Sequence, residues 1–166
     1  MSILPALKWS GSKRSQAKEI LSYFPKHIDT YYEPFIGGGS VLMALLNNSS
    51  ITCKHYVCSD INADLIALYQ AIMKDSLALA ESYSEFWHEL NDKDDDKDRK
   101  REYFYKIRER YNKEHKPEDF LFILRTTTNG MPRYNAKGEF NNSFHITRNG
   151  INPTELHNIL QVWQDI

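Results

Sequence analysis

The 166-residue sequence has few cysteines, no long apolar run and almost no net charge. Its two cysteines, Cys53 and Cys58, are too few for a disulfide scaffold and lack the spacing of a zinc module. The six histidines show no metal-site spacing, so no metal is predicted. No apolar stretch approaches the roughly 18 residues that cross a bilayer, and the N-terminus lacks the order of a secretory signal. These absences predict a soluble protein of the reducing cytoplasm, with no membrane partner.

The charge balance restricts any nucleic-acid site to a local patch. Lys and Arg number 21 against 22 for Asp and Glu, and the resulting charge of -1 excludes a generally basic coat protein. With 41% hydrophobic residues, the chain is long enough for one globular domain with a core and too short for two of ordinary size.

Two successive strand-and-helix units are expected in the first half of the chain. Residues 30–35 form a β-prone run that meets a glycine cluster, and an apolar helical segment follows at 41–46. The pattern repeats with a buried strand at 55–60 and a helix at 62–74, whose apolar residues, among them Leu65 and Tyr69, recur at helical spacing. Two such units favour an α/β layered domain with a parallel sheet.

The remaining segments are expected to be mainly helical. Helices are expected at 14–23 with Ser12 as a candidate cap, at 76–90, at 103–111 and at 153–163, while the apolar run 120–124 fits a strand or a helix. Residues 91–101 hold five acids and five bases and predict a solvated linker. Residues 125–145 are rich in Thr, Asn and Gly and predict a loop leading into a β-hairpin that turns at 135–138.

The most informative feature is the glycine cluster Gly37-Gly38-Gly39 between a strand and a helix. Glycines there let the backbone approach a ligand, although tight packing at a turn is the alternative interpretation. Asp60 ends the next expected strand, where an acid of nucleotide-binding folds hydrogen-bonds ribose hydroxyls. The cluster is not Gly-x-Gly-x-x-Gly, and Glu33 before the turn suits a cationic ligand such as an α-amino group. These features favour S-adenosylmethionine over a dinucleotide.

Four segments, in order, resemble the motifs of one enzyme family. Residues 7–13, 33–40 and 59–69 are similar to the N-terminal cofactor motif, motif I and the acidic motif of Dam-type (D12 class) adenine-N6 DNA methyltransferases. Residues 129–141 resemble the segment that holds their target-recognition hairpin. The resemblance implies a Rossmann-like S-adenosylmethionine-dependent methyltransferase fold, a double-stranded DNA partner and methyl transfer to adenine at a short site such as GATC.

The resemblance also implies which residues bind the cofactor and the DNA. The cofactor positions are Trp9, Lys13, Phe35, Gly37 and Asp60, to which the glycine turn adds Glu33 and Gly39. The DNA positions are Arg125, Asn129, Met131, Arg133, Asn135 and Lys137, with Arg133 placed to reach bases in the major groove. Independently, residues 125–148 hold four basic residues and one acid, which suits phosphate contacts and an arginine fork on guanine.

The catalytic motif of the family, Asp-Pro-Pro-Tyr, is missing from the sequence. No two of the six prolines are adjacent, so no catalytic residue is predicted. In the family this motif holds a flipped adenine and follows the recognition region, near the position where this chain ends. We therefore expect an incomplete sheet with exposed apolar surface where later strands would dock. Residues 1–75 are interpreted as the N-terminal part of the cofactor domain, and 76–166 as a mainly helical recognition region with a hairpin near 129–145.

Three interpretations remain open. The first is a truncated adenine-N6 DNA methyltransferase. The second is a catalytically inactive DNA- or cofactor-binding remnant, or one half of a split enzyme completed by a second polypeptide that carries the catalytic motif. The third, a nucleotide-dependent oxidoreductase, rests only on the glycine turn and Asp60. A cytosine-C5 methyltransferase is disfavoured because neither cysteine follows a proline.

Overall fold

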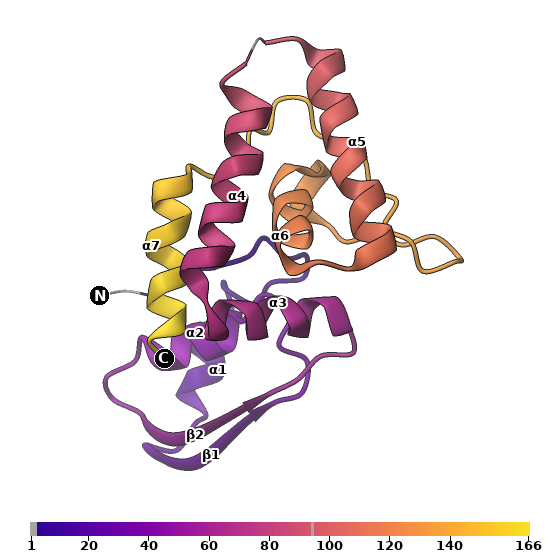
Figure 1. Cartoon of the computed structure of the whole chain (residues 1–166). Helices are drawn as coiled ribbons and strands as arrows, with labels where there is room; N and C mark the ends of the chain where they lie inside the picture. The colour runs from indigo at the N-terminus through magenta and orange to yellow at the C-terminus, as the bar shows by residue number, and fades with distance from the viewer. Residues whose placement is uncertain (1–2, 94) are drawn as a thin grey trace.

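The computed structural model describes residues 3–93 and 95–166 and has a small sheet at one end, with most of the helices stacked beyond it (Figure 1). In chain order the elements are α1 (Ala17–Ser22), β1 (His27–Glu33), α2 (Ser40–Leu46), β2 (Thr52–Cys58), α3 (Ala63–Lys74), α4 (Ser76–Asn91), α5 (Lys97–Glu114), α6 (Pro117–Thr126), the 3-10 turn η1 (Thr128–Gly130) and α7 (Pro153–Gln164). α7 lies along α4, and α6 lies between α4 and α5 (Figure 1).

The sheet of the described chain consists of β1 and β2, which are parallel neighbours connected through α2. Both expected strand-and-helix units and their parallel pairing are therefore confirmed. Tyr31 of β1 is buried at 8% exposure, whereas the next residue, Tyr32, points to the opposite face and is 68% exposed. The strand at 55–60 was expected to be buried, but the residues of β2 are mostly exposed, and Tyr56 among them is 38% exposed. That prediction is wrong because, among the described residues, β2 borders an open cavity that separates it from α3 and α7.

The helical core is built around α6. Every residue from Asp119 to Thr126 is buried, and α6 packs against α3, α4 and α5. The run at 120–124, which fitted either a strand or a helix, is therefore a helix that is apolar on all sides because other helices surround it. None of the helices in the described part of the chain is long and apolar enough to cross a membrane.

Short polar side chains cap most of the longer helices. Side-chain oxygens of Asn62, Asp75, Asp96 and Asn152 accept hydrogen bonds from the first turns of α3, α4, α5 and α7. The predicted cap at Ser12 is wrong, because α1 begins after Gln16 and has no side-chain cap. The Ser12 hydroxyl instead lies 2.7 Å from the Ser40 hydroxyl at the start of α2, so it fixes the N-terminal loop to the glycine turn.

The charged run at 91–101 is only partly the linker that was predicted. α5 begins at Lys97, and Lys100 is 6% exposed with its ammonium 2.6 Å from the Asp95 carboxylate. Arg99 donates to the carbonyl of Glu89 near the end of α4 at 2.9 Å. The prediction failed because mixed charges also suit a helix whose basic side chains find partners on a neighbour. Asp94 lies outside the described residues.

Candidate functional site

A recess of about 300 Å³ lies between the N-terminal loop and the carboxyl ends of both strands. Among the residues that line it are Trp9, Lys13, Glu33, Phe35, Gly37 and Asp60. These are the predicted cofactor residues except Gly39. Ligands of open α/β sheets bind outside the carboxyl ends of the strands, so the recess lies where the topology predicts a ligand.

The glycine turn is packed against the ring of Trp9. At Gly37, φ is +48°, and an added Cβ would lie 3.1 Å from Trp9 Cδ1. Gly37 is therefore closely packed and also lines the recess. Gly39 lies behind the recess, where an added Cβ would lie 3.0 Å from the Trp163 ring and 3.1 Å from the Tyr69 hydroxyl. The structure gives Gly39 a packing role beneath the turn rather than a place in the recess.

Asp60 ties the end of β2 to the glycine turn. Its Oδ2 accepts a hydrogen bond from the Gly37 N–H at 3.0 Å, and its Oδ1 accepts one from the Asn62 N–H, also at 3.0 Å. A carboxylate offers about four lone-pair sites, so these two bonds leave acceptor capacity for two ligand hydroxyls.

Glu33 ends β1 on the inner side of the recess. Its Oε2 accepts hydrogen bonds from the Tyr31 hydroxyl at 2.9 Å and the Leu42 N–H at 3.1 Å. Burial raises the pKa of Glu33, although both hydrogen bonds act to lower it. A ligand cation placed against this carboxylate would favour its charged form.

The predicted hairpin forms with minimal strand pairing. Tyr134 and Phe140 make an antiparallel bridge, and the Asn135 N–H donates to the Glu139 carbonyl at 2.9 Å. The side chain of Asn135 closes the turn, because its Oδ1 accepts from the N–H of Lys137 at 2.9 Å and of Glu139 at 3.0 Å. The exposed DNA candidates are Asn129, Met131, Arg133, Asn135 and Lys137.

Arg125 does not belong to this surface. It is 7% exposed, and its guanidinium donates to the carbonyl of Ala6 and, at 3.4 Å, to that of Pro5. Its Nε is buried and has no hydrogen-bond partner among the residues that the structure describes, and burial lowers the pKa of Arg125. The predicted DNA contact is corrected here, because Arg125 lies inside the protein and holds the N-terminal loop against the end of α6.

Two exposed residues that the sequence reasoning did not select lie beside these sites. Ile61 follows Asp60 and is 97% exposed, which is unusual for an isoleucine. Lys8 precedes Trp9 and lies close to Gly130, where an added Cβ would be 2.8 Å from Lys8 Cβ. Partial burial and then the charges of two arginines lower the pKa of Lys8. The sequence offered one signal for each residue: Ile61 is an apolar residue directly after Asp60, and Lys8 directly precedes Trp9.

The profile of the D12 class N6 adenine-specific DNA methyltransferases matches residues 9–166. The chain belongs to this family. The resemblance to Dam-type (D12 class) adenine-N6 DNA methyltransferases that the sequence motifs indicate is therefore confirmed.

Three relatives show the extent of the similarity. The Type II methyltransferase M.MjaIII of Methanocaldococcus jannaschii is 37% identical over 153 residues, which cover 85% of this chain and 52% of that protein. The DNA adenine methylase of Escherichia coli K12 is 34% identical over 143 residues, covering 83% and 46%. The DNA N-6-adenine-methyltransferase of Escherichia phage P1 is 30% identical over 139 residues, covering 81% and 16%. The chain spans about half the length of the first two relatives.

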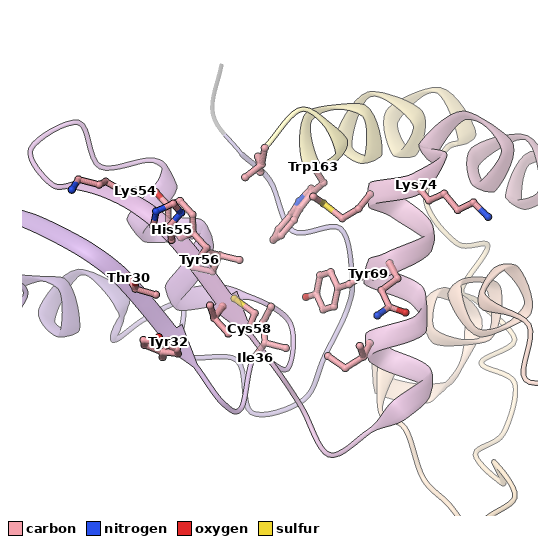
Figure 2. Close-up of a pocket in the computed structure, with 16 residues that line it drawn as sticks. Thr30, Tyr32, Ile36, Lys54, His55, Tyr56, Cys58, Tyr69, Lys74 and Trp163 are labelled. Carbon is pink, nitrogen blue, oxygen red and sulfur yellow. The ribbon is translucent and has the colours of Figure 1, made fainter.

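A second and larger cavity of this D12 family chain, about 1020 Å³, lies between β2 and the helices α3 and α7 (Figure 2). Figure 2 shows Tyr56 and Cys58 of β2 on one side, with Tyr69 and Trp163 facing them across the opening. The exposed side chains of Val57 and Met73 also line it, at 48% and 51% exposure. The cavity is therefore an apolar groove along β2, separate from the recess at the strand ends.

Proposed function

We propose that this chain holds the cofactor-binding and DNA-recognition parts of an enzyme that methylates N6 of adenine at a short site in double-stranded DNA. Residues 1–75 form the N-terminal part of a Rossmann-like, S-adenosylmethionine-dependent domain, and residues 76–166 form the recognition region. The observation that carries the proposal is the recess at the strand ends, which Glu33, Asp60 and the glycine turn line together in a chain of the D12 family.

The donor groups of the recess fit S-adenosylmethionine. Asp60 has acceptor capacity for the two ribose hydroxyls, and Glu33 offers a partly buried carboxylate to the α-ammonium group. Phe35 and Ile61, at 82% and 97% exposure, supply apolar surface for the adenine ring. The bound cofactor supplies an electrophilic methyl group. The residues of this chain bind and orient it, and alignment of donor and acceptor contributes most to a direct displacement.

The surface around the hairpin suits DNA. Arg133 and Lys137 are exposed on the hairpin, and Lys8 lies beside its base. Lysines can contact phosphates without reading sequence, whereas an arginine fork can read guanine O6 and N7. A DNA substrate would be met inside the cell, which agrees with a cytoplasmic location.

The groove along β2 suits the rest of a methyltransferase sheet. Its apolar lining includes Tyr56, Val57 and Trp163, and further strands packed there would bury side chains that are exposed in this chain. We propose that the segment with the Asp-Pro-Pro-Tyr motif docks on this side. It is carried by a longer chain or by a second polypeptide.

Calorimetric titration with sinefungin, a non-transferable analogue of S-adenosylmethionine, tests the cofactor assignment. Sinefungin should bind, and NADH should not. Asp60→Asn and Glu33→Gln should each weaken sinefungin about tenfold, because each changes a charge-assisted contact of about 1.4 kcal/mol. Asp29→Asn is the matched control, since Asp29 lies on β1 with a side chain that is 75% exposed. Absent sinefungin binding, or tighter NADH binding, contradicts the proposal, and the second result would favour an oxidoreductase.

A further inference from the structure

Asn62 joins the cofactor recess to the hairpin. Its backbone N–H donates to Asp60 Oδ1 at 3.0 Å, and its Oδ1 accepts from the Leu65 N–H at 2.9 Å, which caps α3. Its Nδ2 donates to the hydroxyl of Tyr134 at 3.1 Å. One residue therefore contacts the ribose-binding candidate, the start of a core helix and the hairpin, 72 positions further along the chain.

Tyr134 packs against a buried ring of the hairpin while it remains 38% exposed. Its ring lies edge-on to Phe140 with centroids 5.9 Å apart, and Phe140 is 1% exposed. The backbone of Phe140 is fixed to α5 by two hydrogen bonds with the side chain of Asn112, at 2.7 and 3.0 Å. Arg133, which precedes Tyr134, is exposed, so a contact that fixes Tyr134 also restricts where Arg133 can lie.

A second contact fixes the same end of α3 to the recognition region. The Tyr111 hydroxyl of α5 donates to Asp64 Oδ2 at 2.5 Å, and His115 Nδ1 lies 3.1 Å from the same carboxylate oxygen. Burial first, then the hydrogen bonds with Asp64 and Tyr134, raise the pKa of Tyr111, so it remains a neutral donor. Tyr134 therefore interacts with both Asn62 and Tyr111. Its bond to Asn62 is exposed, whereas the bond from Tyr111 to Asp64 is partly buried.

We propose that Tyr134 is a positioning residue that couples occupancy of the cofactor recess to DNA binding by the hairpin. The inference rests on the proposed function, since it needs a ligand that bonds to Asp60. Ribose hydroxyls on Asp60 would hold this carboxylate in the orientation that fixes the Asn62 N–H, and Asn62 would then hold the Tyr134 hydroxyl. The ligand thus favours the joined arrangement over the open one and presents Arg133 in a fixed position. Coupling of this kind is reciprocal, so DNA tightens cofactor binding by the same factor.

The test measures coupling rather than activity. The affinity for a fluorescein-labelled GATC duplex is determined by anisotropy with and without saturating sinefungin. Wild type should bind the duplex at least about fivefold more tightly with sinefungin, which is the lower end of usual coupling. Tyr134→Phe keeps the ring on Phe140 and should bring this ratio close to one. Sinefungin should also slow hydrogen exchange at the Asn135 and Asn141 amides in wild type and not in Tyr134→Phe.

Matched variants separate the bond from the fold. Asn62→Ser keeps a cap for α3 but is too short to reach Tyr134, so it should lose the coupling. Asn62→Asp also keeps the cap, and the second carboxylate oxygen can accept a hydrogen bond from the Tyr134 hydroxyl. This variant should therefore retain the coupling. Tyr23→Phe changes a tyrosine that is 81% exposed at the end of α1 and should behave as wild type.

The failures are distinguishable. If wild type binds neither sinefungin nor the duplex, the proposed function is wrong and the coupling fails with it. If wild type binds both but sinefungin leaves duplex affinity unchanged, or if Tyr134→Phe keeps the wild-type ratio and exchange protection, the positioning role alone is refuted.

Discussion

Substitution of Gly39 by alanine should destabilise the protein without altering the recess directly. Gly39 has a φ of +67°, where an L-residue costs about 1–2 kcal/mol. The added Cβ would also lie 3.0 Å from the Trp163 ring and 3.1 Å from the Tyr69 hydroxyl. Neither neighbour moves freely, because Trp163 Nε1 donates to the Leu4 carbonyl at 2.7 Å and the Tyr69 hydroxyl donates to the Gly37 carbonyl at 3.0 Å. Overpacking adds about 1 kcal/mol, for a total near 2–3 kcal/mol.

Urea unfolding followed by tryptophan fluorescence measures this loss as a lower midpoint at constant slope. Gly37→Ala provides the comparison, because it is also left-handed but faces Trp9 in the recess. Gly37→Ala should lower the free energy of unfolding by about 1–2 kcal/mol. This loss is smaller than that of Gly39→Ala, because the ring of Trp9 can shift by a few tenths of an ångström. Gly37→Ala should weaken sinefungin more than Gly39→Ala does. An unchanged midpoint for Gly39→Ala, or a larger sinefungin effect from that variant, would refute the assignment of packing to one glycine and ligand approach to the other.

Three further predictions follow from buried charges. Asp119→Ala should cost about 3 kcal/mol in urea unfolding, because the fully buried Asp119 carboxylate bonds to the Arg110 guanidinium; equal stability of wild type and variant would contradict it. Arg125→Met should lower stability by about 2 kcal/mol through loss of its bond to the Ala6 carbonyl, while DNA affinity of the folded variant stays at the wild-type value; a loss of affinity would restore Arg125 as a DNA contact. Burial raises the pKa of Glu33 in the folded state, so wild type should lose stability relative to Glu33→Gln as pH rises from the unfolded value of 4.5 through the folded pKa; a pH-independent difference in melting experiments would refute this.

The sequence predicts those helices, strands and turns that depend on neighbouring residues. The glycine cluster, the strand before it and the repeat that ends at Asp60 lie where periodicity and turn residues indicate. Because parallel strands end at the same edge of a sheet, Glu33 and Asp60 both line the recess there. The hairpin follows from the turn residues at 135–138, although its flanks pair at an isolated bridge, Tyr134 with Phe140.

Tertiary packing decides the features that the sequence did not predict. Arg125 lies in a polar segment that is typical of the protein surface. It is buried because the N-terminal loop, more than a hundred positions earlier in the chain, crosses the end of α6. Tyr56 was expected in the core because a β-prone run reads as buried, and its exposure depends on which further strands are present. No window of neighbouring residues contains this information.

The packing of α3 shows that the proposed division at residue 75 does not separate two hydrophobic cores. Leu65, Leu68 and Ile72 are all fully buried, and α3 packs against α4, α6 and α7 of the recognition region. The hydroxyl of Ser76 lies 2.6 Å from Gln164 Oε1, which fixes the start of α4 to the end of α7. The loop from Asp60 to Asn62, which leads into α3, is therefore attached to the helical core. β2 has mostly exposed side chains, so a destabilised sheet would loosen the strand ends of the recess before it altered the hairpin surface.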